Sequence, residues 1–154
     1  MRVSDIMTAH PLTVALDDSL GVAIERMQSI GCRRLPVVNQ DGALVGIITD
    51  RDTRLALHSP YLPHDLGEDV ALLQNVPVRA VMTPAPITVE PTALIEDAIS
   101  LMITHRIGGL PVLKGESVVG VVTSTDIMTA FARYLRREQV SRERFAEVAS
   151  RTDR

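Results

Sequence analysis

Apolar residues recur along two stretches of the chain with the period of an amphipathic helix. In the first stretch they stand at positions i, i+3, i+4, i+7 and i+10, which places them on one helical face. These residues are Leu20, Ala23, Ile24, Met27 and Ile30. We expect helices over about residues 18–30 and 92–105. Asp18 and Ser19 are candidates for the first N-cap, and Pro91-Thr92 suits the start of the second helix.

Each predicted helix is followed by two short apolar runs that have the composition of β-strands and are separated by a turn. A short helical segment is expected before each Met-Thr pair, at Met7 and Met82, and an extended piece after it. A further helix is expected directly after Thr49 and after Thr123. Each half of the chain therefore predicts a β-α-β-β-α unit. The strands are expected at 12–14, 35–38 and 43–49, and again at 87–89, 110–113 and 117–123.

The two units are copies of one another. At an offset of about 75 residues, with one deletion in a turn, 16 of roughly 45 aligned positions are identical. A lone unit of this size has a marginal core, so we expect the copies to bury their sheets against each other about a pseudo-two-fold axis. The predicted fold class is α+β. The expected organisation is repeat 1 over 1–58, a linker over 59–75, repeat 2 over 76–132, and an Arg-rich helical tail over 133–154.

Composition excludes several classes of protein. The 154 residues include one cysteine, Cys32, which rules out an internal disulfide and a cysteine-rich zinc site. An aromatic content of 3% and a net charge of −3 disfavour binding of nucleic acid. No apolar run has the length of a membrane span, and no signal peptide is seen, so we expect a cytoplasmic protein with no membrane association. No catalytic motif is present, and His58, His64 and Asp65 match no rigid metal frame. We therefore expect neither an enzyme nor a metal site, and no cofactor.

The motifs resemble a known family. In the first copy, Met7-Thr is followed by Thr-Val, an amphipathic helix, Leu35-Pro-Val and Val45-Gly-Ile-Ile-Thr-Asp-Arg-Asp, which resembles a CBS domain. The second copy carries Ile107-Gly-Gly-Leu-Pro-Val and Val119-Gly-Val-Val-Thr-Ser-Thr-Asp. In tandem they resemble a CBS pair, or Bateman module, over about residues 1–132. The resemblance implies a disc-like pair, clefts between the copies that bind AMP, ADP, ATP or S-adenosylmethionine, and a homodimer.

Two four-residue stretches stand where a strand passes into a helix. They are Thr49–Asp52 and Thr123–Asp126. Each fits a capping box, in which the threonine and the aspartate cap free N–H groups reciprocally. The same place suits a ligand, because a helix N-terminus attracts phosphate and a carboxylate can accept hydrogen bonds from ribose hydroxyls. The resemblance implies ribose or phosphate contacts for Thr49, Asp52, Thr123 and Asp126, and both interpretations stay open.

Arg33 and Arg34 stand directly before the first Leu-Pro, and guanidinium groups suit phosphate oxygens. The resemblance implies phosphate contacts for both, against the alternative of a solvated strand edge. The second copy has Gly108 and Gly109 there, so we expect asymmetric sites. The family's adenine slot is aliphatic and comes from the opposite copy, against the alternative of plain core packing. It would comprise Ile87, Thr88 and Ile107 at the Asp52 site, and Leu12, Thr13 and Cys32 at the Asp126 site.

These observations predict a regulatory module that senses an adenine nucleotide or another adenosyl compound. Its shape change would pass to a regulated partner protein or act through self-association. The alternative is an oligomerisation or protein-interaction module without a bound nucleotide. The tail from Arg133 to Arg154 holds seven arginines against four acidic residues, which favours helix packing or dimer contacts. Nucleic-acid binding by this tail is a weaker alternative, because the charge excess is small.

Overall fold

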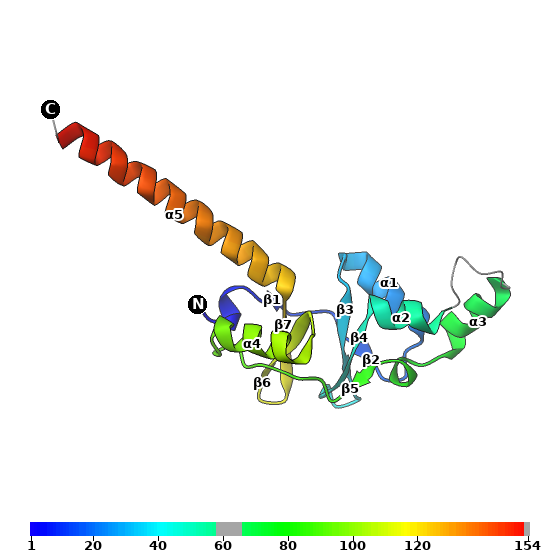
Figure 1. Ribbon diagram of the computed structural model, residues 1–154. Coiled ribbons are helices and arrows are strands. Elements are labelled where there is room, and N and C mark those ends of the chain that lie inside the picture. The colour runs from blue at the N-terminus through cyan, green and yellow to red at the C-terminus, as the bar shows by residue number, and fades with distance from the viewer. Residues whose placement is uncertain (58–65, 153–154) are drawn as a thin grey trace.

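The chain forms an α+β structure with two small sheets that meet near the middle of the molecule (Figure 1). The computed structural model describes residues 1–57 and 66–152, and side chains within these ranges except those of residues 66 and 141–152. Repeat 1 contains β2 (Val14–Ala15), α1 (Leu20–Ile30), β3 (Arg34–Val38), β4 (Leu44–Thr49) and α2 (Asp50–Ala56). Repeat 2 contains α4 (Ile95–His105), β6 (Gly109–Lys114), β7 (Ser117–Thr123) and α5 (Ser124–Thr152). Ala43 bridges to Ser117 across the junction of the repeats.

Most of the predicted helices and strands are confirmed, although the strand expected at 12–14 is found only as β2, from Val14. Ser19 is the N-cap of α1, where its hydroxyl accepts a hydrogen bond from the Val22 N–H, and Gly31 ends the helix in the left-handed conformation. The strand pairs β3–β4 and β6–β7 lie within one residue of their predicted ranges. Of the predicted strand at 87–89, Val89 alone makes an isolated parallel bridge, to Val112.

The predicted start of α4 at Pro91-Thr92 is wrong. The helix begins at Ile95, and its N-cap is Leu94, which makes no side-chain capping bond. The reason is a competing role for the preceding backbone. The carbonyls of Pro91 and Ala93 accept hydrogen bonds from the N–H groups of Ser4 and Val3, at 2.9 Å each. These residues therefore pair with the start of the chain instead of forming the first helical turn.

Each repeat is completed by the leading segment of the other. The 3₁₀ helix η1 (Val3–Asp5) and β1 (Thr8–Ala9) come from the first copy, but β1 pairs with β7 of the second. In return, η2 (Val78–Ala80) and β5 (Thr83–Pro84) come from the second copy, and β5 pairs with β4 of the first. The sheets are therefore ordered β1-β7-β6 and β2-β3-β4-β5. The predicted β-α-β-β-α unit does not close on its own residues.

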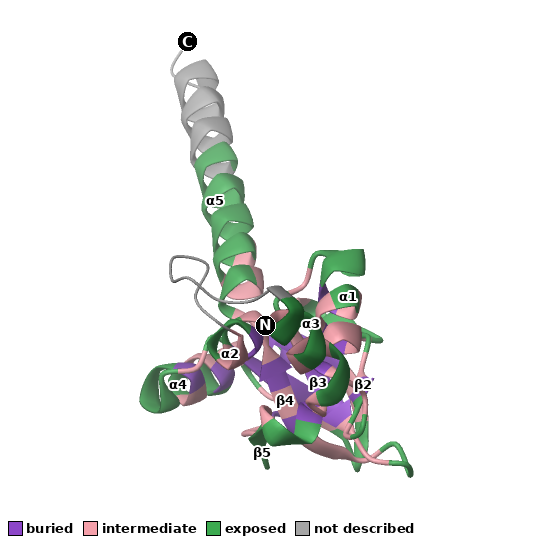
Figure 2. Cartoon of the chain, turned by 90° about the vertical axis from the view of Figure 1, so that its right-hand side faces the viewer, coloured by how far each residue is buried: buried purple, intermediate pink, exposed green. Residues whose placement is uncertain are grey.

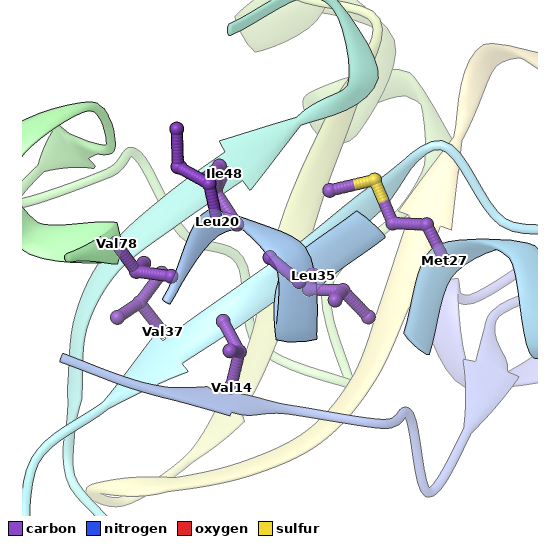
Figure 3. Packing of buried hydrophobic residues seen from close by; sticks show 8 residues of the cluster. Val14, Leu20, Met27, Leu35, Val37, Ile48 and Val78 are labelled. Carbon is purple, nitrogen blue, oxygen red and sulfur yellow. The ribbon is translucent and has the colours of Figure 1, made fainter. Parts of the chain in front are cut away.

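The two hydrophobic cores show the same exchange. Val78 packs into the core of repeat 1, beside the labelled side chains of Figure 3, and is fully buried. Val3 is equally buried in the core of repeat 2. The Val78 N–H donates to the Asp18 carbonyl at 2.8 Å, the counterpart of the bond from Val3 to Ala93. Two copies of a half-domain therefore form two cores that neither copy can complete alone.

Two pairs of residues that recur in both copies, the Met-Thr pair and the Val-Gly pair, meet across this exchange. A Cβ atom on Gly46 would collide with the Met82 sulfur, and one on Gly120 with the Met7 sulfur. Both glycines are buried, and each lies on a strand that receives the leading strand of the other repeat. Glycine at these positions leaves the volume that the methionine side chain fills.

We expect Gly120→Ala to destabilise the protein by about 1–3 kcal/mol, because the added methyl group overpacks the Met7 contact. In a Met7→Ala background the same substitution should be less destabilising, which a double-mutant cycle in urea measures as a coupling energy. Ser117→Ala, on the same strand and exposed, serves as the control. Additive effects of Gly120→Ala and Met7→Ala would contradict the proposed contact.

One helix lies between the repeats in the chain, and another extends beyond the second repeat. The predicted linker contains a helix, α3 (Leu66–Asn75), which packs against α1. The helix expected after Thr123 and the predicted helical tail form one helix, α5, which leaves the body of the molecule (Figure 1). Most of its side chains up to residue 140 are exposed (Figure 2). Apolar side chains on one face of α5 are uncovered, since Phe131 and Leu135 are 59% and 50% exposed. None of the described helices has the length and apolar character needed to cross a membrane.

Candidate functional site

Two clefts open between the repeats. The larger, with a volume of about 580 Å³, contains Thr49 and Asp52 of repeat 1 and is called the Asp52 cleft. The smaller, of about 310 Å³, contains Thr123 and Asp126 of repeat 2 and is called the Asp126 cleft. Both volumes lie in the range of small-molecule sites. Each cleft takes residues from both repeats, so the pairing of the repeats creates it.

The Thr-Asp stretches form the predicted capping boxes. The Asp52 Oδ2 atom accepts hydrogen bonds from the Thr49 N–H at 2.8 Å and from the Thr49 hydroxyl at 2.7 Å. The Asp52 N–H donates to the Thr49 Oγ1 atom at 3.2 Å. Asp126 and Thr123 repeat this arrangement at 2.8, 2.6 and 3.2 Å. Within the described part of the chain, no donor reaches the second carboxylate oxygen of either aspartate, so the cap uses only half of each carboxylate.

Arg33 and Arg34 line both clefts. Arg33 is exposed, whereas Arg34 is half-buried and lies over the Gly108-Gly109 backbone of the other repeat. A Cβ atom on Gly109 would stand 2.8 Å from the Arg34 Cζ atom, so a larger residue there would displace the guanidinium from this position. Burial lowers the pKa of Arg34 and the charge of Arg33 lowers it further, while Asp50 and Asp126 act in the opposite direction. The guanidinium thus stands between the charges of the two clefts.

Two further arginines line the Asp52 cleft and were not among the predicted site residues. They are Arg51, at the start of α2, and Arg106, at the end of α4. Arg106 is the C-cap of α4 with a φ of 53°, a left-handed conformation that favours glycine. Its counterpart in repeat 1 is Gly31, which also has a left-handed backbone and lines the Asp126 cleft. Alignment of the two copies, which places an arginine opposite that glycine, is the signal that would have found Arg106.

The predicted adenine-slot residues divide into two groups. Ile87 and Ile107 line the Asp52 cleft, and Leu12 and Cys32 line the Asp126 cleft. Thr88 and Thr13 do not line these clefts. The Thr13 carbonyl instead accepts a hydrogen bond from Arg26 at 2.7 Å, which ties this backbone to α1. The clefts therefore contain the aliphatic members of the predicted slots but not the threonines.

The two clefts differ in charge. Four arginines and two aspartates, Asp50 and Asp52, line the Asp52 cleft. Two arginines and Asp126 line the other. The Asp52 cleft alone has cations of its own beyond the shared pair. This arrangement can hold an anionic group beside an aliphatic wall and an unused carboxylate oxygen.

Within the described residues, no group of three or more His, Cys, Asp or Glu side chains is placed to hold a metal ion. The linker residues His58, His64 and Asp65 lie outside the described residues.

Comparison with known proteins identifies the repeats. The family model described as "CBS domain" matches residues 3–59 and 78–133. A CBS domain-containing protein of Dictyostelium discoideum is 38% identical over 134 residues, covering 86% of this chain and 92% of that protein. The chain spans only 22% to 32% of several longer curated proteins that it also matches.

Solved structures show the same fold. A putative acetoin utilization protein from Vibrio cholerae has a TM-score of 0.72 and 29% identity, covering 90% of this chain and 96% of that one. The CBS domain pair of protein MJ0100, solved in complex with 5′-methylthioadenosine and S-adenosyl-L-methionine, has a TM-score of 0.71 and 29% identity. It matches 85% of this chain and 99% of that chain. Both halves of this chain thus match in family and in fold, and the chain belongs to the CBS domain family as a tandem pair.

Proposed function

We propose that the chain is a regulatory module that binds an adenosyl compound in the clefts between its repeats. The observation that carries this proposal is the composition of the Asp52 cleft. Two aliphatic side chains from repeat 2, Ile87 and Ile107, line the same cleft as Asp52, which has one carboxylate oxygen that the capping box leaves unused. An apolar slot with a few convergent polar groups is how small-molecule sites are generally built. The adenosyl ligands of the MJ0100 pair support the same class of ligand.

Each part of such a ligand has a matching group in the Asp52 cleft. The adenine ring would lie against Ile87 and Ile107, and the ribose hydroxyls would donate to Asp52. Phosphate oxygens would meet Arg33, Arg34 and the two further arginines of this cleft, whose guanidinium groups bind phosphate in bidentate fashion. In the smaller cleft, Leu12, Cys32, Thr123 and Asp126 would take the corresponding roles.

Because the ligand would contact both repeats, its binding would favour one relative placement of them. That change would reach a regulated partner, or a second copy of the chain, and no reaction is required of the site.

A thermal-shift panel of AMP, ADP, ATP, S-adenosylmethionine and 5′-methylthioadenosine tests this proposal. A ligand at a hundredfold excess over its Kd should stabilise the fold by about 2.7 kcal/mol. For a domain of this size, that corresponds to a rise in Tm of several degrees. Guanosine and cytidine monophosphates are matched controls that carry phosphate without adenine. Absence of any shift at millimolar adenosyl compound would contradict the proposal.

The second candidate function is protein interaction without a nucleotide, and the exposed face of α5 favours it. Met128, Phe131 and Leu135 lie on this face and are 62%, 59% and 50% exposed. Apolar side chains gathered on one exposed face are typical of interaction surfaces. A concentration-dependent molar mass by light scattering, combined with a negative ligand panel, would favour this alternative.

A further inference from the structure

The site assigned above contains an arginine that the two clefts share. Arg34 belongs to β3 of repeat 1, yet its guanidinium covers the buried Gly109 and the adjacent Gly108 of repeat 2. It lines both clefts, and no other side chain or carbonyl in the described ranges holds it by a hydrogen bond or an ion pair. It is therefore a half-buried cation that borders both clefts.

Apart from Arg33 and Arg34, the two clefts differ in the number of arginines that line them. Without Arg33 and Arg34, the Asp52 cleft still has Arg51 and Arg106. The positions that match these two in the Asp126 cleft are Thr125 and Gly31. The Asp126 cleft would then contain the charge of Asp126 alone. An anionic ligand there depends entirely on the two shared arginines, whereas one in the Asp52 cleft does not.

We propose that Arg34 couples the two clefts, so that the chain binds one phosphate-bearing adenosyl ligand tightly, in the Asp52 cleft, and disfavours a second. The proposal rests on the adenosyl-binding function proposed above. A phosphate in the Asp52 cleft attracts Arg34, and the Asp126 cleft loses one of its two cations at the same time. The reverse holds as well, because coupling between binding sites is reciprocal. An adenosyl ligand without phosphate has no charge to recruit Arg34, so it occupies both clefts independently.

Calorimetric titrations with AMP and with adenosine, which differ only in the phosphate, test the coupling. Wild-type protein should bind AMP at one tight site and at a second site weaker by about tenfold or more. Adenosine should bind two sites whose affinities differ by less. In Arg34→Gln, the first AMP site should weaken by about tenfold while the second stays unchanged, since a hydrogen-bonded charge contributes roughly 1.5–3 kcal/mol.

A second pair of variants shows whether Arg34 is shared. In Asp52→Asn, which weakens the Asp52 cleft, AMP should bind the Asp126 cleft more tightly than the second AMP binds wild type. This gain should vanish in Asp52→Asn/Arg34→Gln. Direct repulsion between two phosphates would instead preserve the gain without Arg34.

A preserved gain, or two independent AMP sites in wild type, would overturn the coupling and leave the adenosyl function standing. A protein that binds adenosine but does not bind AMP would also overturn the coupling and leave the adenosyl function standing. Failure of both ligands to bind would overturn the adenosyl function as well.

Discussion

Replacing Val3 with aspartate is expected to unfold repeat 2 while repeat 1 keeps its sheet. Val3 belongs to the first copy in sequence, but its side chain has no exposed surface and lies in the second core beside Leu110 and Val112. A carboxylate placed there would have to remain charged in an apolar environment or take up a proton, and either state is costly. We expect a loss of more than about 4 kcal/mol, in the range that buried charges produce. This is a large part of the stability of an ordinary domain.

Hydrogen exchange measured by mass spectrometry locates the damage. Amides of β6 and β7 should lose protection in Val3→Asp, while those of β3 and β4 retain it, because exchange reports local opening. Val78→Asp should give the opposite pattern, since Val78 packs into the core of repeat 1. Ser4→Asp, at the neighbouring exposed position, is the control and should leave both sheets protected. Equal loss from both sheets in Val3→Asp, or loss confined to β3 and β4, would contradict this prediction.

The local features of the fold could be predicted from the sequence because their causes are local. The period of Leu20, Ala23 and Met27 indicates one buried helical face, and these three side chains are buried in the first core. The deletion in the second copy indicates the turn between paired strands. Capping depends on residues three apart, so the Thr49–Asp52 box could be predicted as well.

The exchange of leading segments could not be predicted in this way. Val3 and Val78 are the same residue at matching positions, and so are Met7 and Met82. Either copy of the core would accept either valine, so the pattern of residues does not indicate which one each core receives. The choice is made by non-local backbone pairing, such as the hydrogen bond from Val3 to Ala93.

The candidate site also has parts with local causes, which the sequence predicts, and parts that depend on how distant segments pack, which it does not predict. Thr49 and Asp52 follow from their motif, and the contrast between Arg34 and Gly109 predicts asymmetric clefts. The contact between Arg34 and Gly109 could not be predicted, because it depends on how the repeats face each other. Arg106 belongs to none of the motifs, so no motif indicates that it lines the cleft. Its position there depends on the left-handed turn that ends α4.

The two roles of Asp52, as a helix cap and as a ribose acceptor, are expected to separate in a pair of variants. Asp52→Asn keeps one oxygen, which can still accept from the Thr49 N–H as Oδ2 does now. Its amide nitrogen takes the place of the unused oxygen, and it donates hydrogen bonds but cannot accept them from ribose hydroxyls. We expect the Kd for AMP in the Asp52 cleft to rise by about 10- to 100-fold, since hydrogen bonds to a charged group contribute roughly 1.5–3 kcal/mol. The free energy of unfolding should change little.

Asp52→Ala should lose the same affinity and also about 1 kcal/mol of stability, because it removes the N3 half of the capping box, which accepts from the Thr49 N–H. Calorimetry measures the first effect and urea unfolding without ligand measures the second. A ligand lacking both ribose hydroxyls, 2′,3′-dideoxy-AMP, should bind wild type about as weakly as AMP binds Asp52→Asn, and should lose little more in that variant. Asp126→Asn, in the other cleft, should leave the Asp52 cleft within about twofold of wild type. If Asp52→Asn binds AMP like wild type while Asp52→Ala is less stable, the carboxylate serves the helix alone and the ribose is held elsewhere.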